Sequence, residues 1–117
     1  MPREIYLVTP QAVDFEAVVR AAAEVDESLL LRGLYGGSAL QLVGSDDQAV
    51  LTCDSSRLLA DVADARRVTR GMELPDARDV WWTEAFVPWG AAGDAGVAVM
   101  VGVVRRLGGQ VKVEDGT

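Results

Sequence analysis

The sequence predicts a single α+β domain spanning residues 1–117. Short runs rich in β-branched and aromatic residues recur between turn residues, which is typical of strands. Two longer segments carry apolar residues at helical spacing. Half of the 117 residues are hydrophobic, so the chain can bury a core without disulfides or a metal.

The first strand and the first helix are expected near the start of the chain. Glu4 to Thr9 has apolar side chains on both faces, so we expect both faces to be covered. Asp14 is the expected N-cap of a helix. The apolar residues of this helix that are expected to face inward are Phe15, Val18, Val19, Ala22 and Val25.

A three-stranded meander and a second helix are expected next. Turn residues divide this stretch into strands at Leu29 to Tyr35, Ala39 to Val43 and Ala49 to Cys53. The polar run Asp54-Ser55-Ser56 can then cap a helix that extends from Ser56 to Arg66.

The segment from Asp79 to Trp89 holds all three tryptophans of the chain. Alternation places Trp81, Thr83, Ala85 and Val87 on one face of a strand, and Trp82, Glu84 and Phe86 on the other. Such a strand is expected to be central and covered on both sides. The alternative is that the second face is open to a partner. Because Glu84 shares a face with Trp82, we expect Trp81 in the core and Trp82 to be more accessible.

The segment from Ala91 to Leu107 fits two patterns. Its valines alternate as in a buried strand, yet Asp94 is a possible N-cap and Gly108-Gly109 supply a helix C-terminus. The length between these ends favours a helix. Gln110 to Glu114 is the expected closing strand, with Val111 and Val113 inward and Lys112 outward.

The predicted order of elements is β-α-β-β-β-α-β-α-β. Right-handed crossovers would place the first and last helices on the same side of one sheet. The sequence therefore predicts a ferredoxin-like two-layer sandwich, with a mixed sheet, an extra hairpin and helices packed mainly on one face.

Composition excludes several classes of function. The formal charge is −7, from eighteen acidic and eleven basic residues, which disfavours nucleic acid and anionic membranes as partners. The chain has one cysteine and no histidine, so we expect no cofactor, no Cys/His zinc site and no catalytic triad. No signal peptide or membrane-length apolar run is evident, so we expect a cytoplasmic protein.

The remaining motifs are weak indicators of chemistry. The run Gly90-x-x-Gly93-x-x-Gly96 lacks the start of a dinucleotide-binding loop. Glu84 could act as a general base among apolar neighbours, or it could face solvent or pair with Arg32. Cys53 is expected to be a small buried hydrophobe.

One set of residues resembles a known class of proteins. The set comprises Trp81-Trp82-Thr83-Glu84-Ala85-x-x-Pro88, an Ala/Val-rich helix, Leu107-Gly108-Gly109, the hairpin Leu40-Gln41-Leu42-Val43-x-x-Asp46-Asp47-x-Ala49-Val50-Leu51, and Ser55-Ser56-Arg57-Leu58. Over residues 40 to 114 this pattern resembles small actinobacterial immunity-type proteins, which neutralise polymorphic or secreted toxins by binding them. The resemblance implies an acidic, one-domain inhibitor and transfers no binding residue.

The leading hypothesis is therefore a non-catalytic module that binds a basic protein, such as a cognate toxin, as a monomer or homodimer. Acidic groups would steer the encounter and aromatic residues would anchor the interface. The candidate partner-binding residues are Asp46, Asp47, Asp54, Asp79, Trp82, Glu84 and Trp89, with Asp76 as a further acidic candidate. The alternatives are a small-ligand-sensing ferredoxin-like regulatory domain and a small enzyme that depends on a carboxylate such as Glu84 or Asp79.

Overall fold

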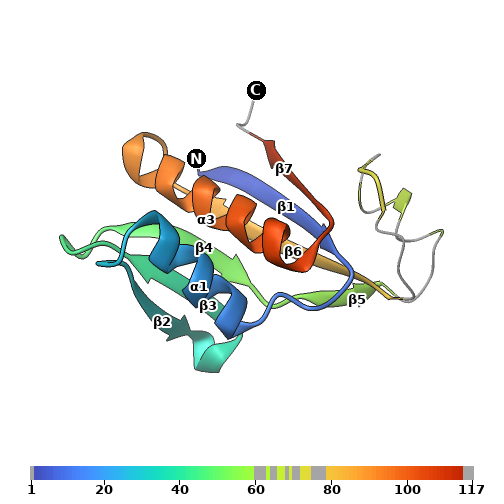
Figure 1. Ribbon diagram of the computed structural model, residues 1–117, viewed down its shortest axis with the longest axis horizontal. Helices are drawn as coiled ribbons and strands as arrows, with labels where there is room; N and C mark the ends of the chain where they lie inside the picture. The colour runs from blue at the N-terminus through green and yellow to red at the C-terminus, as the bar shows by residue number, and fades with distance from the viewer. Residues whose placement is uncertain are drawn as a thin grey trace.

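The computed structural model describes residues 2–59, 63, 66–67, 69, 72–74 and 79–114 (Figure 1). It has a seven-stranded sheet and two described helices. The strands are β1 (Arg3–Thr9), β2 (Leu30–Leu34), β3 (Ala39–Val43), β4 (Ala49–Asp54), β5 (Arg57–Leu59), β6 (Val80–Val87) and β7 (Gln110–Glu114). The helices are α1 (Phe15–Val25) and α3 (Ala91–Leu107), and a short 3-10 turn, Tyr35–Gly37, joins β2 to β3.

The sheet has the strand order β2-β3-β4-β6-β1-β7, and β5 pairs with β6. Every described pair of neighbouring strands is antiparallel, so the prediction of a mixed sheet is wrong. The predicted meander of β2, β3 and β4 is confirmed. β6 and β7 both pair antiparallel with β1, which lies between them, so these two strands run parallel to each other and α3 connects them.

A β-bulge separates β4 from β5. Cys53 pairs with Ala85 and Arg57 pairs with Trp82. Between these two pairs, the three residues 54–56 lie opposite only the two residues 83–84 of β6. One extra residue of this kind defines a β-bulge. The helix predicted from Ser56 is wrong at its start because Arg57–Leu59 continues the sheet. Most of the remainder of that predicted helix lies outside the described residues.

Helix α1 begins as predicted and packs differently from the prediction. The carboxylate of Asp14 accepts a hydrogen bond from the backbone N–H of Ala17 at 2.8 Å, which confirms the N-cap. The buried residues are Ala17, Val18, Ala21 and Ala22, whereas Phe15 is 61% exposed and Val19 and Val25 are also exposed. The prediction for these three residues is wrong because α1 packs against α3 through its small alanine side chains.

Helix α3 confirms the helical reading of residues 91–107, and two of its glycines explain how closely it lies on the sheet. A Cβ on Gly93 would overlap the carbonyl oxygen of Pro88, and a Cβ on Gly96 would overlap that of Val50. The predicted N-cap is wrong. Gly90 is the capping residue, and Asp94, in the first turn, instead pairs with Arg3 at 3.0 Å.

The main core lies between the helices and one face of the sheet. It contains Ile5 and Leu7 of β1, Leu42 and Leu51 of the meander, and Val99, Met100 and Val103 of α3. Figure 1 shows α1 and α3 side by side in front of the strands. We call the opposite side of the sheet the outer face. A second, smaller cluster on that face contains Tyr6, Val8 and Trp82.

The two adjacent tryptophans reverse the prediction. Trp82 is 3% exposed because it stacks on Tyr6 in the second cluster, against which Met72 and Leu74 pack. Trp81 is only partly buried because it lies near the end of β6, opposite Leu58, which is itself 48% exposed.

The closing strand is partly as expected. Val111 packs against the main core, but Val113 is 40% exposed because it lies near the end of β7, an edge strand of the sheet. Neither described helix has the length and apolar character that a bilayer crossing requires.

Candidate functional site

The outer face has Glu84 near its centre. Glu84 is opposite Tyr6 in the pairing of β6 with β1, and on its other side β6 faces the bulge between β4 and β5. Its side chain is 39% exposed. A carboxylate is therefore held in the middle of a seven-stranded sheet and remains open to solvent.

An aromatic pair supports this carboxylate. The rings of Tyr6 and Trp82 are stacked, with centroids 5.1 Å apart and planes inclined by 15°. The indole Nε1 of Trp82 donates a hydrogen bond to Glu84 Oε1 at 3.1 Å. The hydroxyl of Tyr6 donates a hydrogen bond to a carboxylate oxygen of Glu4. Two buried rings thus hold two partly exposed carboxylates in place. The hydrogen bonds from Tyr6 and Trp82 fix the side chains of Glu4 and Glu84, whose carboxylates remain accessible to solvent.

Glu84 also has a basic neighbour. Arg57 Nη2 lies 3.8 Å from Glu84 Oε1, and both side chains are substantially exposed, so the pair contributes little to stability. Arg32, which the sequence suggested as a partner of Glu84, does not pair with it. Arg32 instead donates to the side-chain oxygen of Gln41 and lies 3.8 Å from Asp47.

A second acidic feature is present at the β7 edge of the outer face. Glu4 and Glu114 are directly opposite each other in the pairing of β1 with β7. Like charges in this position repel, because directly opposite Cβ atoms are about 4.5–5.5 Å apart. Glu114 pairs with Lys112 at 3.5 Å, within its own strand.

The seven predicted site residues fall into three groups. Asp54, Trp82 and Glu84 lie together around the bulge and line a shallow hollow of about 320 Å³ with Ser55 and Arg57. Asp46 and Asp47 are exposed at the tip of the β3–β4 hairpin. Asp79 is exposed just before β6, and Asp76 lies outside the described residues.

Trp89 belongs with the hairpin end of the sheet, since it follows Val87, which pairs with Arg3 at the start of β1. It is 55% exposed. The guanidinium carbon of Arg3 lies 5.4 Å from the centroid of its ring, within range of a cation–π contact. Trp82 and Trp89 therefore lie in different regions, and Trp82 is too buried to be a direct contact residue.

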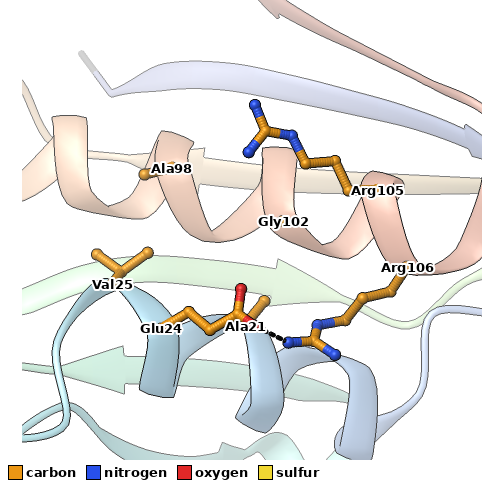
Figure 2. Close-up of a pocket in the computed structure, with 7 residues that line it drawn as sticks. All are labelled: Ala21, Glu24, Val25, Ala98, Gly102, Arg105 and Arg106. Carbon is orange, nitrogen blue, oxygen red and sulfur yellow. Dashed lines mark hydrogen bonds and ion pairs between the residues drawn. The ribbon is translucent and has the colours of Figure 1, made fainter.

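Two further hollows are lined by residues of α1, and Glu84 lines neither of them. One, of about 430 Å³, lies between α1 and α3 (Figure 2). Figure 2 shows Arg106 of α3 reaching to Glu24 of α1, with which it forms an ion pair, and Ala21 of α1 and Gly102 of α3 also line the hollow. This hollow is a groove between two helices, and the ion pair of Arg106 with Glu24 spans it. The other, of about 370 Å³, lies between the start of α1 and the bulge.

The chemistry available near these sites is limited. Burial and the nearby Asp54 carboxylate raise the pKa of the Cys53 thiol to about 12, so this thiol is protonated and inert at neutral pH. Within the described residues, no three His, Cys, Asp or Glu side chains come together as metal ligands. The arrangement around Glu84 offers a carboxylate hydrogen-bond acceptor that the Trp82 indole holds in place, which suits recognition of a cation.

The predicted residues omitted several members of this site, namely Glu4, Tyr6, Arg57 and Glu114. Alternation along β1 already places Glu4 and Tyr6 on one face of a strand. What the sequence lacks is a local signal that β1 and β6 are neighbours, because they lie more than seventy residues apart.

Comparison of the chain with protein-family models, with curated proteins and with solved structures found no match.

Proposed function

We propose that this protein is a non-catalytic binding module that captures a basic protein through the outer face of its sheet. Within that class, we propose an immunity protein that acts in the cytoplasm and neutralises a basic toxin by occluding its active site. The opposition of Glu4 and Glu114 across β1 and β7 carries the proposal.

This opposition gathers negative charge on the outer face, although each of the carboxylates also has a contact within the protein. Directly opposite carboxylates repel, and Glu84 is a diagonal neighbour of Glu4, a relation that corresponds to about 7–8 Å. The pairs that Glu114 and Glu84 form with Lys112 and Arg57 are 3.5 and 3.8 Å long and partly or largely exposed, so each pair contributes little against that repulsion. A lysine or arginine from a partner would relieve it.

Rigidity and net charge support the same function. The stacked rings of Tyr6 and Trp82 hold the carboxylates of Glu4 and Glu84 in place, so binding orders few side chains. The net charge of −7 accelerates encounter with a cationic surface.

The ferredoxin-like description of the fold is part of the proposal. The unit β6–α3–β7, with β1 inserted between its two strands, supports this proposal, because it would form half of such a sandwich. The meander β2–β3–β4 would then be an extension of that sheet.

The experiment uses the product of the gene adjacent to the one that encodes this chain, which the proposal requires to be a basic protein. We expect the purified chain to bind that protein and to protect cells that express it. The double variant Glu4→Gln/Glu114→Gln should bind about tenfold more weakly, yet unfold at an equal or higher denaturant concentration because the repulsion is gone. Glu27→Gln, an exposed acid beyond α1, is the matched control and should leave binding unchanged. Absence of binding and protection would contradict the proposal.

A further inference from the structure

The bulge between β4 and β5 lies between two hollows. Asp54 and Ser55 line the polar hollow that contains Trp82 and Glu84, and they also line the hollow of about 370 Å³ beside the start of α1. The walls of the second hollow are mainly apolar and include Val13, Phe15 and Leu40. We use the name corner for the bulge residues 54–56 together with Val13, Phe15 and Leu40.

The corner exposes apolar surface that the core does not use. Phe15 is 61% exposed although it opens a helix of the core, and Tyr35, in the adjacent 3-10 turn, is 84% exposed. Tyr35 also has a φ of 52°, in the left-handed region that bulky residues rarely adopt. Exposed aromatic residues beside a hollow are typical of a surface that binds a partner.

The corner also carries a carboxylate with no internal role. The side chain of Asp54 is exposed and makes no hydrogen bond or ion pair with the described part of the chain. The other acidic residues in the described strands of the outer face, Glu4, Glu84 and Glu114, each have a contact within the chain.

Hydrogen bonds hold the corner in one arrangement. Ser56 Oγ accepts a hydrogen bond from the backbone N–H of Val13 at 2.9 Å and lies 2.7 Å from the hydroxyl of Thr83. Ser55 Oγ donates to the carbonyl oxygen of Ser38 at 2.7 Å. The bulge is thereby tied to the entry of α1, to β6 and to the β2–β3 turn, so that the apolar walls and the Asp54 carboxylate are preorganised.

We infer that the corner binds a basic residue of the protein partner together with an adjacent apolar residue. The apolar side chain occupies the hollow against Phe15 and Leu40, and the cation of arginine or lysine reaches Asp54. Charge complementarity selects this occupant, because Asp54, an anion, is the one polar side chain lining this hollow that has no partner in the described part of the chain. The inference rests on the proposed function and identifies the part of the partner that anchors the complex.

The first test uses blocked dipeptides and needs no knowledge of the partner. In an amide NMR titration with acetyl-Leu-Arg-amide at millimolar concentrations, we expect shifts confined to the corner, at Val13, Leu40 and Ser55. Acetyl-Leu-Glu-amide and acetyl-Gly-Arg-amide, which lack the cation and the apolar group respectively, should shift these signals less. Absence of shifts at the corner, or equal shifts with all three dipeptides, would overturn the inference.

Variants provide the second test. Asp54→Asn should weaken dipeptide binding about tenfold, the scale of one charge-assisted hydrogen bond. Phe15→Ala should weaken it several-fold and leave stability unchanged, since the ring is mostly exposed. The matched controls are Glu27→Gln and Leu30→Ala, an acid and a 65% exposed apolar residue away from the corner. Both controls should bind as the wild type does, and equal losses in the controls would overturn the inference.

The same variants separate the two proposals. If the wild type binds the basic protein and Asp54→Asn and Phe15→Ala bind it equally well, the corner is not the anchor and the proposed function stands. If the corner binds the dipeptide but no basic protein is bound, the immunity function fails and the corner remains a peptide site.

Discussion

The indole of Trp82 stacks on the phenol of Tyr6 at a centroid distance of 5.1 Å, across the central strand pair of the outer face. This contact contributes both to the packing of the second cluster and to the proposed site, because Trp82 and Tyr6 also donate hydrogen bonds to Glu84 and Glu4. Loss of either ring would therefore affect both the second cluster and the position of the carboxylates.

Replacement of Trp82 tests this relation. Because Trp82 is 3% exposed, Trp82→Ala should lower the free energy of unfolding by about 3–5 kcal/mol. Trp81→Ala should cost distinctly less, since Trp81 is only partly buried. Denaturant titrations followed by circular dichroism measure both. Trp82→Phe, which keeps a ring but not the Nε1–H donor, is the control and should recover most of the loss. An equal or larger loss for Trp81→Ala would contradict the observed packing.

The reversal of these tryptophans shows what the sequence could predict. Alternation correctly assigned Trp81 and Trp82 to opposite faces of β6. It could not show which face is better covered at that end of the strand, because the cover comes from Met72 and Leu74, which follow β5 in the chain. Periodicity describes one element, whereas burial depends on what packs against it.

The same limit applies to the helices and to the site. Asp14 and Gly108-Gly109 are local signals, and they predicted the start of α1 and the end of α3, whereas the N-cap of α3 was wrongly predicted at Asp94. The inward face of α1 was predicted correctly at Val18 and Ala22. It was wrong at its other large residues because small side chains meet α3. At the site, Glu84 was predicted, but Glu4 and Glu114 required knowledge of the strand order.

The glycines of α3 should be needed for close packing. Gly96→Ala places a methyl group against the carbonyl of Val50 and the side chain of Val87, so it should destabilise the fold by about 1–3 kcal/mol despite the better helix propensity of alanine. Gly102→Ala is the matched control in the same helix. Its Cβ would lie 3.2 Å from the Cβ of Ala21, so a small shift accommodates it. Thermal unfolding compares the two, and equal stability of both variants would argue against the close approach of α3.

The raised pKa of Cys53 predicts that the free energy of unfolding decreases at alkaline pH. Its folded pKa is raised from 9.0 to about 12, mainly by burial and further by Asp54, so the unfolded chain releases its proton first as pH rises. The contribution of Cys53 to the free energy of unfolding is fully present below about pH 9. It declines between pH 9 and 12 by at most about 1.4 kcal/mol per pH unit. Denaturant titrations from pH 8 to 11 measure this slope. Cys53→Ala removes the thiol, so a slope unchanged in this variant would contradict the assignment.

The hairpin tip should control the rate of association with a basic partner. Asp46 and Asp47 are exposed, and screening acts over about 10 Å at 0.1 M ionic strength, so added salt should slow association. Asp46→Asn/Asp47→Asn should reduce the on-rate several-fold and leave the off-rate nearly unchanged. Asparagine suits position 47, where φ is 64°.

Trp89 provides the contrasting variant, because it is 55% exposed at the same end of the sheet and can be an anchor where Trp82 cannot. If Trp89 lies within the interface, Trp89→Ala should raise the off-rate by an amount that corresponds to about 2 kcal/mol or more, with little change in the on-rate. Surface-binding kinetics at two salt concentrations separate the effects of steering and anchoring. An on-rate that responds neither to salt nor to the two aspartates would remove the steering argument, whereas an unchanged off-rate for Trp89→Ala would confine the anchor to the corner around Phe15 and Asp54.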